Sequence, residues 1–193
     1  MGGGIYCLVP PAATDNLVIV NNTIVGNVAT YAEFQPPMNE QGGGIAISLP
    51  PPIPPVEPPP AGKLIIGNNI IAFNSSGIYQ TATTPMLSFT LKNNDLFNTG
   101  VDYRDVASGI GDISADPLFL DKSGGDFHLA FSSPCIDTGD NAAAGLIAYD
   151  FDGNPRIMDC NMTGLAVVDI KTKEVTFGAF EGRVSDERVE GYI

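Results

Sequence analysis

The chain has 193 residues, of which 44% are hydrophobic and 22 are glycine, and its formal net charge is −13. This size and composition favour one elongated domain over two globular ones. The negative charge argues against a nucleic-acid partner and against an anionic membrane surface, because both need positive charge that the chain lacks. No apolar run approaches the length of a membrane span, so we expect none.

Three related stretches organise the first half of the chain. Each contains a short apolar or β-branched run, an Asn-Asn pair, a second apolar run and a closing asparagine: 17–27, 63–74 and 87–98. Runs of this length, flanked by Gly and Asn, are typical of strands and bends. A second phrase accompanies them, Gly-Gly-Gly-Ile at 2–5 and 42–45 and Ser-Gly-Ile-Tyr at 76–79.

The spacing of the Asn pairs indicates a repeat. Their second members, Asn22, Asn69 and Asn94, lie 47 and 25 positions apart. The longer interval contains two insertions, so one unit of roughly 25 residues fits the range of solenoid repeats. Stacked at a strand spacing of ~4.8 Å, such units place aliphatic side chains inside and asparagines over one another, which predicts a hydrogen-bonded Asn ladder.

These observations predict an all-β fold, a parallel β-helix. The alternative is an antiparallel sandwich of three hairpins, which needs two-residue Asn-Gly or Asp-Gly turns between paired strands; none separates the strands here. The pattern Asn-Asn-x-Ile-x-x-Asn followed by Gly-Ile-Tyr resembles the repeats of right-handed parallel β-helix proteins of the pectate-lyase-like superfamily. The resemblance covers roughly residues 2–131 and implies a right-handed solenoid of about four to five coils.

We therefore place the coils in residues 1–131 and an irregular capping segment in 132–193. Two Pro-containing insertions, 31–41 and 49–60, should loop off the coil. Eight of the twelve residues in 49–60 are proline, which favours extended polyproline II. The chain opens inside a repeat, and two interpretations stay open: a C-terminal piece of a longer protein, or a coil that stacks on another chain.

The second half reads differently. Two short strands are expected at 116–119 and 126–129, with a turn between them. The phrases at 116–119, 133–140, 150–156 and 177–181 resemble, in order, the C-terminal segment of bacterial β-helix surface and secreted proteins of the choice-of-anchor Q type. In that family the phrases Asp-Ile and Gly-Ala-Phe-Glu are contiguous, whereas residues 171–177 separate them here. The resemblance implies an extracellular or cell-surface location.

A cluster of oxygen-bearing side chains is the candidate metal site. The sequence Asp-x-Asp-Gly-Asn at 150–154 places three oxygen ligands on a tight turn, as a hard cation such as Ca²⁺ requires. The alternative is that these side chains only cap the turn and pair with Arg156. The candidate calcium ligands are Asp137, Asp140, Asp150, Asp152 and Asn154, with Asp169 as a further member.

No catalytic residue and no further cofactor is assigned. Uronate lyases need an Arg or Lys base, and only Lys63, Lys92 and Arg104 precede the tail. Hydrolases of this architecture use several aspartates on adjacent coils, for which the candidates are Asp15, Asp95, Asp102 and Asp105. We interpret 102–105 as a solvated turn. His128 is the one histidine, which is too little for a Ser-His or Cys-His site.

Two smaller features complete the sequence reading. Tyr6 and Tyr79 follow Gly-Ile at matching places and are candidates for stacking against sugars, although Ala46 interrupts the column. Cys135 and Cys160 would pair in an exported product, which leaves Cys7 as an inward-facing coil residue.

We expect a non-catalytic exported or cell-surface β-helix protein with a structural, adhesive or fibre-forming role. Its partners would be a polysaccharide or its own copies, stacked end to end. The alternative is the C-terminal fragment of a polysaccharide lyase or glycoside hydrolase. Two or more carboxylates, or an Arg/Lys pair with Ca²⁺, stacked on one outer face would favour the enzyme.

Overall fold

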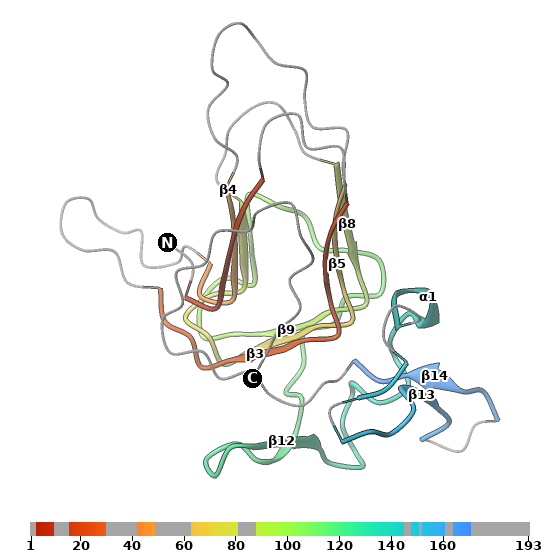
Figure 1. The fold of residues 1–193 in the computed structure, drawn as a ribbon. Coiled ribbons are helices and arrows are strands. Elements are labelled where there is room, and N and C mark those ends of the chain that lie inside the picture. Colours follow the sequence, from red (N-terminus) through yellow and green to blue (C-terminus); the bar gives the residue numbers. More distant parts are fainter. Residues whose placement is uncertain are drawn as a thin grey trace, which may run out of the picture.

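In the computed structural model, the chain folds almost entirely as β-strands (Figure 1). The structure describes residues 3–9, 16–29, 42–48, 63–80, 88–144, 148–150, 152–160 and 164–170. The described elements are β1 (Ile5–Leu8), β2 (Leu17–Val20), β3 (Thr23–Val25), β4 (Ile45–Ser48), β5 (Lys63–Gly67), β6 (Ile70–Ala72), β7 (Ile78–Gln80), β8 (Ser88–Lys92), β9 (Asp95–Phe97), β10 (Tyr103–Arg104), β11 (Phe119–Asp121), β12 (Asp126–Leu129), α1 (Asn141–Ala144), β13 (Ile157–Met158) and β14 (Val167–Val168). The predicted insertions at 31–41, 49–60 and 171–177 lie outside the described residues.

The first ten strands form three parallel sheets, in the orders β1-β4-β7-β10, β2-β5-β8 and β3-β6-β9. Each turn of the chain adds one strand to each sheet, so the sheets form three sides of a solenoid-like stack (Figure 1). The described residues contain three complete coils and the beginning of a fourth, where about four to five were expected. The prediction of an all-β fold with stacked parallel strands is confirmed.

The register follows the sequence repeat. Leu64 of β5 pairs with Leu17 of β2 on one side and with Phe89 of β8 on the other. In the first sheet, Ile45 of β4 pairs with Ile5 and with Ile78. Both repeated phrases therefore align as predicted, because a strand displaced by one residue would turn its apolar side chains to the wrong face.

The prediction of a solvated turn at 102–105 is wrong for its central residues. Tyr103 and Arg104 form β10, which pairs in parallel with β7 as the fourth strand of the first sheet. The Gly-Ile signal of the other copies is absent here, but Tyr103 occupies the inward position of Ile78. Sequence analysis therefore missed this fourth strand, because its residues are more polar than those of the other copies.

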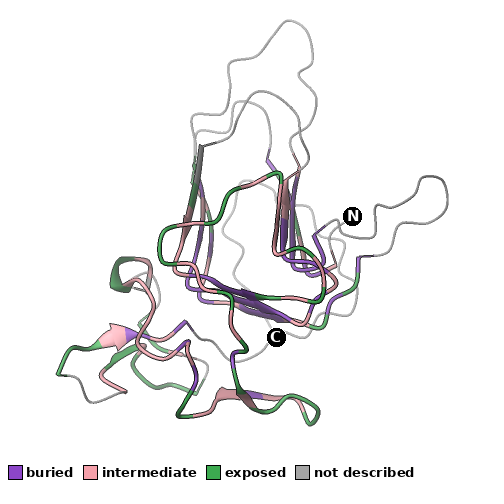
Figure 2. Ribbon diagram, turned by 180° about the vertical axis from the view of Figure 1, so that it is seen from behind, coloured by how far each residue is buried: buried purple, intermediate pink, exposed green. Residues whose placement is uncertain are grey.

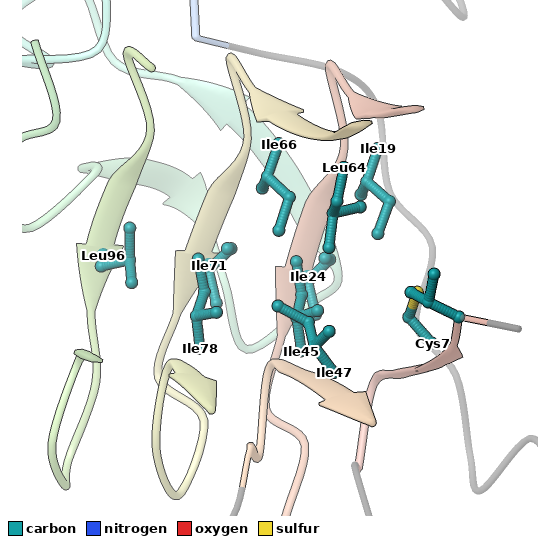
Figure 3. Packing of buried hydrophobic residues seen from close by; sticks show 11 residues of the cluster. Cys7, Ile19, Ile24, Ile45, Ile47, Leu64, Ile66, Ile71, Ile78 and Leu96 are labelled. Atoms are coloured by element: carbon teal, nitrogen blue, oxygen red, sulfur yellow. The ribbon is translucent and has the colours of Figure 1, made fainter. Parts of the chain in front are cut away.

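Aliphatic side chains fill the interior of the stack, where the three sheets face one another (Figure 3). Isoleucine and leucine dominate this core: Ile19, Ile24, Ile45, Ile47, Leu64, Ile66, Ile71, Ile78 and Leu96, with Cys7 and Val9. Cys7 is 1% exposed and lies inside, as the sequence predicts for a coil residue. Burial of this continuous apolar column is the main stabilising term for units that could not fold singly.

The tail packs on the outside of the stack, against the sheet β3-β6-β9. It begins with the antiparallel hairpin β11-β12, close to the predicted short strands, and continues through α1 and the pair β13-β14. Ile70 and Ala72 point outward from β6 and are buried under Cys135 and Ile170 of the tail. Figure 2 shows the consequence: burial is concentrated in the coils, whereas most of the tail is half-buried or exposed. No described helix is long and apolar enough to cross a membrane.

Candidate functional site

The predicted asparagine ladder is confirmed. Asn22 donates from its backbone N–H and from Nδ2 to Oδ1 of Asn69, at 3.0 Å each. Asn69 repeats both bonds to Oδ1 of Asn94, at 3.2 and 2.9 Å. Asn69 and Asn94 are fully buried, so the ladder satisfies amides that would otherwise be costly to bury.

A second ladder, formed by the closing asparagines of the repeat, runs along the next corner. Asn27 donates from N–H and Nδ2 to Oδ1 of Asn74, at 2.9 and 3.0 Å. Asn74 donates in the same way to Asn98, at 3.0 and 2.9 Å. Two hydrogen-bonded columns therefore fix the register of the coils at two bends.

Each ladder ends on an aspartate. Asn94 donates from N–H and Nδ2 to Oδ1 of Asp112, at 2.8 and 3.0 Å, and Asn98 does the same to Oδ1 of Asp102, at 3.2 and 2.8 Å. The second oxygen of Asp112 accepts the Tyr103 hydroxyl at 2.7 Å. Burial, and then this bond to Asp112, raises the pKa of Tyr103. The sequence candidate Asp102 is thus a ladder terminus.

The first asparagine of the second and third pairs has a different role: it faces outward and holds the tail. Asn68, at φ +54°, accepts the backbone N–H of Asp140 at 2.7 Å and donates to the carbonyl of the same residue at 3.0 Å. Asn93 donates to the Thr138 carbonyl at 2.8 Å. Lys92 adds an ion pair to the Asp140 carboxylate at 2.9 Å. Ala143 of α1 lies close to Gly67 of β5.

Asp95 is a buried carboxylate between the coils and the tail. It opens β9 at the outward position that Thr23 and Ile70 hold in the previous coils. Its oxygens accept the Ala115 N–H at 3.1 Å and the Cys135 thiol at 3.2 Å. Burial raises the pKa of Asp95 to about 6, against partial compensation by these two donors. Asp95 therefore serves the attachment of the tail.

The predicted calcium ligands are divided among several contacts. Asp140 pairs with Lys92, and Asp152 contacts His128 Nε2 at 2.9 Å. Asp150 accepts the N–H of Asn154 at 2.8 Å, so these two cap their own turn. The contact between Asp150 and Asn154 fits the alternative in which these side chains only cap the turn. Calcium binding stays a prediction.

One compact group of potential ligands exists among the described residues: Asp137, Cys160 and Asp169, whose ligand atoms all lie within 4.8 Å of one another. Asp169 accepts the Asp137 N–H at 2.9 Å, and Asp137 accepts the Cys160 N–H at 3.3 Å. The group thereby joins two segments of the tail. All three cysteines are free, so the structure does not contain the expected disulfide between Cys135 and Cys160.

His128 lies between two carboxylates. Nδ1 contacts Asp126 on the same strand, and Nε2 contacts Asp152 beyond the hairpin. A neutral imidazole donates from one nitrogen only, whereas the imidazolium donates from both. Hydrogen bonds to Asp152 and then to Asp126 therefore raise the pKa of His128. His128 therefore links β12 to the turn at 152–154, and we call this link the clasp.

The outer side of the first sheet carries the candidate binding surface. Tyr6, Ala46, Tyr79 and Arg104 are consecutive partners across the four strands β1-β4-β7-β10, and we name these four residues the tyrosine face. Tyr6 is 37% exposed and Tyr79 is half-buried, while the small Ala46 between them is buried. Sequence analysis identified the tyrosine pair but not Arg104, because β10 was not recognised as a strand.

Comparisons with known proteins give one family. Residues 63–143, less than half of the chain, match the family described as "Disaggregatase related". No curated protein and no solved structure shows significant similarity to the chain. These comparisons provide no support for the resemblance to pectate-lyase-like or choice-of-anchor Q proteins.

Proposed function

We propose that this chain is a non-catalytic, exported or cell-surface solenoid with a structural or adhesive role, and that it contacts glycans through the tyrosine face. One observation carries the proposal: two tyrosines and an arginine lie side by side on one outer sheet face, with an alanine between the tyrosines. The proposed ligand is a polysaccharide, which the protein binds without making or breaking a covalent bond.

The spacing of the two rings supports this function. Tyr6 and Tyr79 lie on strands separated by β4, which places them two strand spacings, or about 10 Å, apart. Neither hydroxyl makes a hydrogen bond within the part of the chain that the structure describes. A tyrosine offers an apolar ring that stacks on the C–H face of a pyranose and a hydroxyl that bonds to its polar rim. Ala46 between them is small and buried, so a bound sugar chain would contact the two flanking rings.

Binding of neutral and uronate-containing oligosaccharides, measured by calorimetry on the purified chain, tests the proposal. Removal of one stacking ring should weaken binding about tenfold, for a loss of about 1.4 kcal/mol. Tyr79→Ala and Tyr6→Ala should both show this loss. Tyr149→Ala removes a tyrosine that is 60% exposed in the tail and should have no effect. Equal binding by all three variants would refute the assignment of this face.

Two further parts of the proposal concern handedness and location. We propose that the coils are right-handed, since parallel strands of one sheet are joined by right-handed connections in about 98% of cases. A crystal structure of the chain would test this directly. We also propose an extracellular or cell-surface location, in keeping with a polysaccharide ligand. Digestion by an external protease in intact cells should remove the chain; full protection would contradict this location.

An enzymatic function is the second candidate, because the matched family carries the name of a disaggregatase. The described coils do not favour it. Their outward strand positions hold one carboxylate, Asp95, which is buried beneath the tail, and no stacked pair of carboxylates. Incubation with polysaccharides and measurement of new reducing ends or unsaturated uronates separates the candidates. Turnover would replace the binding function proposed above.

Calcium at the Asp150–Asn154 turn remains a proposal of its own. A bound Ca²⁺ stabilises the folded state by mass action. Its removal with a chelator should therefore lower the melting temperature, and Asp150→Asn should abolish that difference. An unchanged melting temperature would eliminate calcium as a cofactor.

A further inference from the structure

A buried carboxylate lies in the interface between the coils and the tail. Asp95 of β9 is the register partner of Ile70 on β6, and Ile70 packs under Cys135 and Ile170 of the tail. Both hydrogen bonds of the Asp95 side chain go to residues that follow β10. Oδ1 accepts the Ala115 N–H at 3.1 Å, and Oδ2 accepts the Cys135 thiol at 3.2 Å. The tail therefore covers this carboxylate and supplies both of these donors.

The surroundings of Asp95 favour the neutral carboxyl group. Burial raises the pKa of Asp95 most, and the negative charges of Asp102 and Asp116 act in the same direction. The two hydrogen-bond donors oppose these effects only in part. Lys92, three positions earlier in the chain, is engaged elsewhere, since its Nζ pairs with the Asp140 carboxylate at 2.9 Å. A negative charge on Asp95 is therefore poorly compensated while the tail is in place.

The thiol beside Asp95 does not titrate with it. Burial, and then the charge of Asp95, raise the pKa of Cys135, and Asp169 acts in the same direction. Cys135 therefore stays protonated and remains a donor, although a thiol donates only weakly. Between these two contacting side chains, the exchange of a proton with solvent is confined to Asp95.

We propose that the protonation of Asp95 controls how firmly the tail covers the β3-β6-β9 sheet, so that the tail is held in mildly acidic solution and loosens as the solution becomes neutral. A neutral carboxyl group is tolerated beneath the tail, whereas a carboxylate is better solvated when the tail moves away and water reaches it. The backbone N–H of Asp95 donates to the Asn69 carbonyl at 2.8 Å, so β9 keeps its place in the stack when the tail opens.

The loosening is local because the tail and the stack have separate apolar clusters. Four buried residues form the cluster between β6 and the tail, whereas eleven form the interior of the stack. Regions with few buried apolar contacts open more readily than the core of a protein. Detachment of the tail is therefore expected well before the coils unfold.

The size of the effect follows from the linkage between protonation and attachment. The pKa of Asp95 is about 6 beneath the tail, against an ordinary value of 3.8 for an exposed side chain. The stabilisation by the bound proton is fully present below pH 3.8 and is lost as the pH rises through about 6. From pH 5 to pH 8, the equilibrium constant for detachment should therefore rise about tenfold.

Hydrogen exchange of backbone amides, measured by NMR on the full chain between pH 5 and pH 8, tests the proposal. The Asp140 N–H reports attachment, because it donates to Oδ1 of Asn68 across the interface at 2.7 Å. The Ile45 N–H, which donates to the Gly77 carbonyl at 3.0 Å within the coils, is the internal reference. After correction for the intrinsic exchange rate at each pH, protection of Asp140 should fall about tenfold and that of Ile45 should not change.

Variants separate Asp95 from other titrating groups. Asp95→Asn should keep at pH 8 the protection of the Asp140 amide that it shows at pH 5. Asp95→Thr is a second neutral variant, in case the first does not fold, because Thr23 holds the equivalent position of the first coil. Asp105→Asn removes an exposed carboxylate and should behave like the wild type.

Three results would overturn the proposal. The first is equal protection of the Asp140 amide at pH 5 and pH 8 in the wild type. The second is the same pH dependence in a folded Asp95 variant, since another group would then control the tail. The third is a parallel loss of protection at Ile45, which would show that ionisation acts on the whole fold and not on the attachment of the tail.

Discussion

Asp95 allows the cost of a buried carboxylate to be measured at a defined interface. Its side chain is fully buried between β9 and the tail, and two donors, the Ala115 N–H and the Cys135 thiol, contact its oxygens. Replacement by asparagine keeps an acceptor for Ala115 and removes the charge. Its amide can face the Cys135 sulfur, which is a weak acceptor. The perturbation therefore isolates ionisation from packing.

The magnitude follows from the two pKa values. Burial raises the pKa of Asp95 from 3.8 to about 6, so the folded protein retains a proton that the unfolded chain has already released. The stabilisation by protonated Asp95 is fully present below pH 3.8 and is lost as the pH rises through about 6. At about 1.4 kcal/mol per pKa unit, the loss is about 3 kcal/mol. Asp95→Asn should regain up to that amount at pH 7 and nothing at pH 4.

Urea unfolding between pH 4 and 8 tests this expectation, with the difference between wild type and variant taken at each pH. The exposed Asp105 provides the matched control, since Asp105→Asn removes a charge from the surface at a position where φ is +56°, which asparagine tolerates. At pH 7 the gain from Asp95→Asn should clearly exceed any change from Asp105→Asn. A flat Asp95 difference would show that the buried carboxylate is not penalised, and the reasoning from desolvation would fail.

Three further outcomes test other contacts. Asn69→Ala should lower the free energy of unfolding by about 3–5 kcal/mol, at about 1–3 kcal/mol for each buried group left unsatisfied; Asn22→Ala, at the end of the ladder, should cost about 1 kcal/mol in the same urea assay. Gly77→Ala places a methyl group against a carbonyl of the next coil and should cost about 1–3 kcal/mol. Gly26→Ala meets nothing within 4 Å and should cost about 1 kcal/mol for its positive φ, as thermal melts can check. His128→Gln should destabilise most below the ordinary pKa of 6.5, and its effect should fade as the pH rises past the raised pKa of the folded state; a constant difference would exclude the clasp.

Much of the coil was predictable because its signal is periodic. Asn22, Asn69 and Asn94 recur with the same apolar neighbours, and only one register keeps those neighbours inside. The ladder termini were missed because they break the rule: Asp112 and Asp102 are not asparagines, and they lie 18 and 4 residues beyond the amides that they accept. Chemistry rather than spacing selects them, since a final rung needs only acceptors.

The attachment of the tail was not predictable from any repeat. The bonds between Asn68 and Asp140 span 72 residues, and the contact between Asp95 and Cys135 spans 40. Each contact occurs once, so no repeated sequence pattern predicts it. The Asn pair itself also conceals two roles, since one member faces the ladder and its neighbour faces the tail. At the bend, Asn68 adopts φ +54°, and the side chains of the two neighbouring asparagines therefore point in different directions.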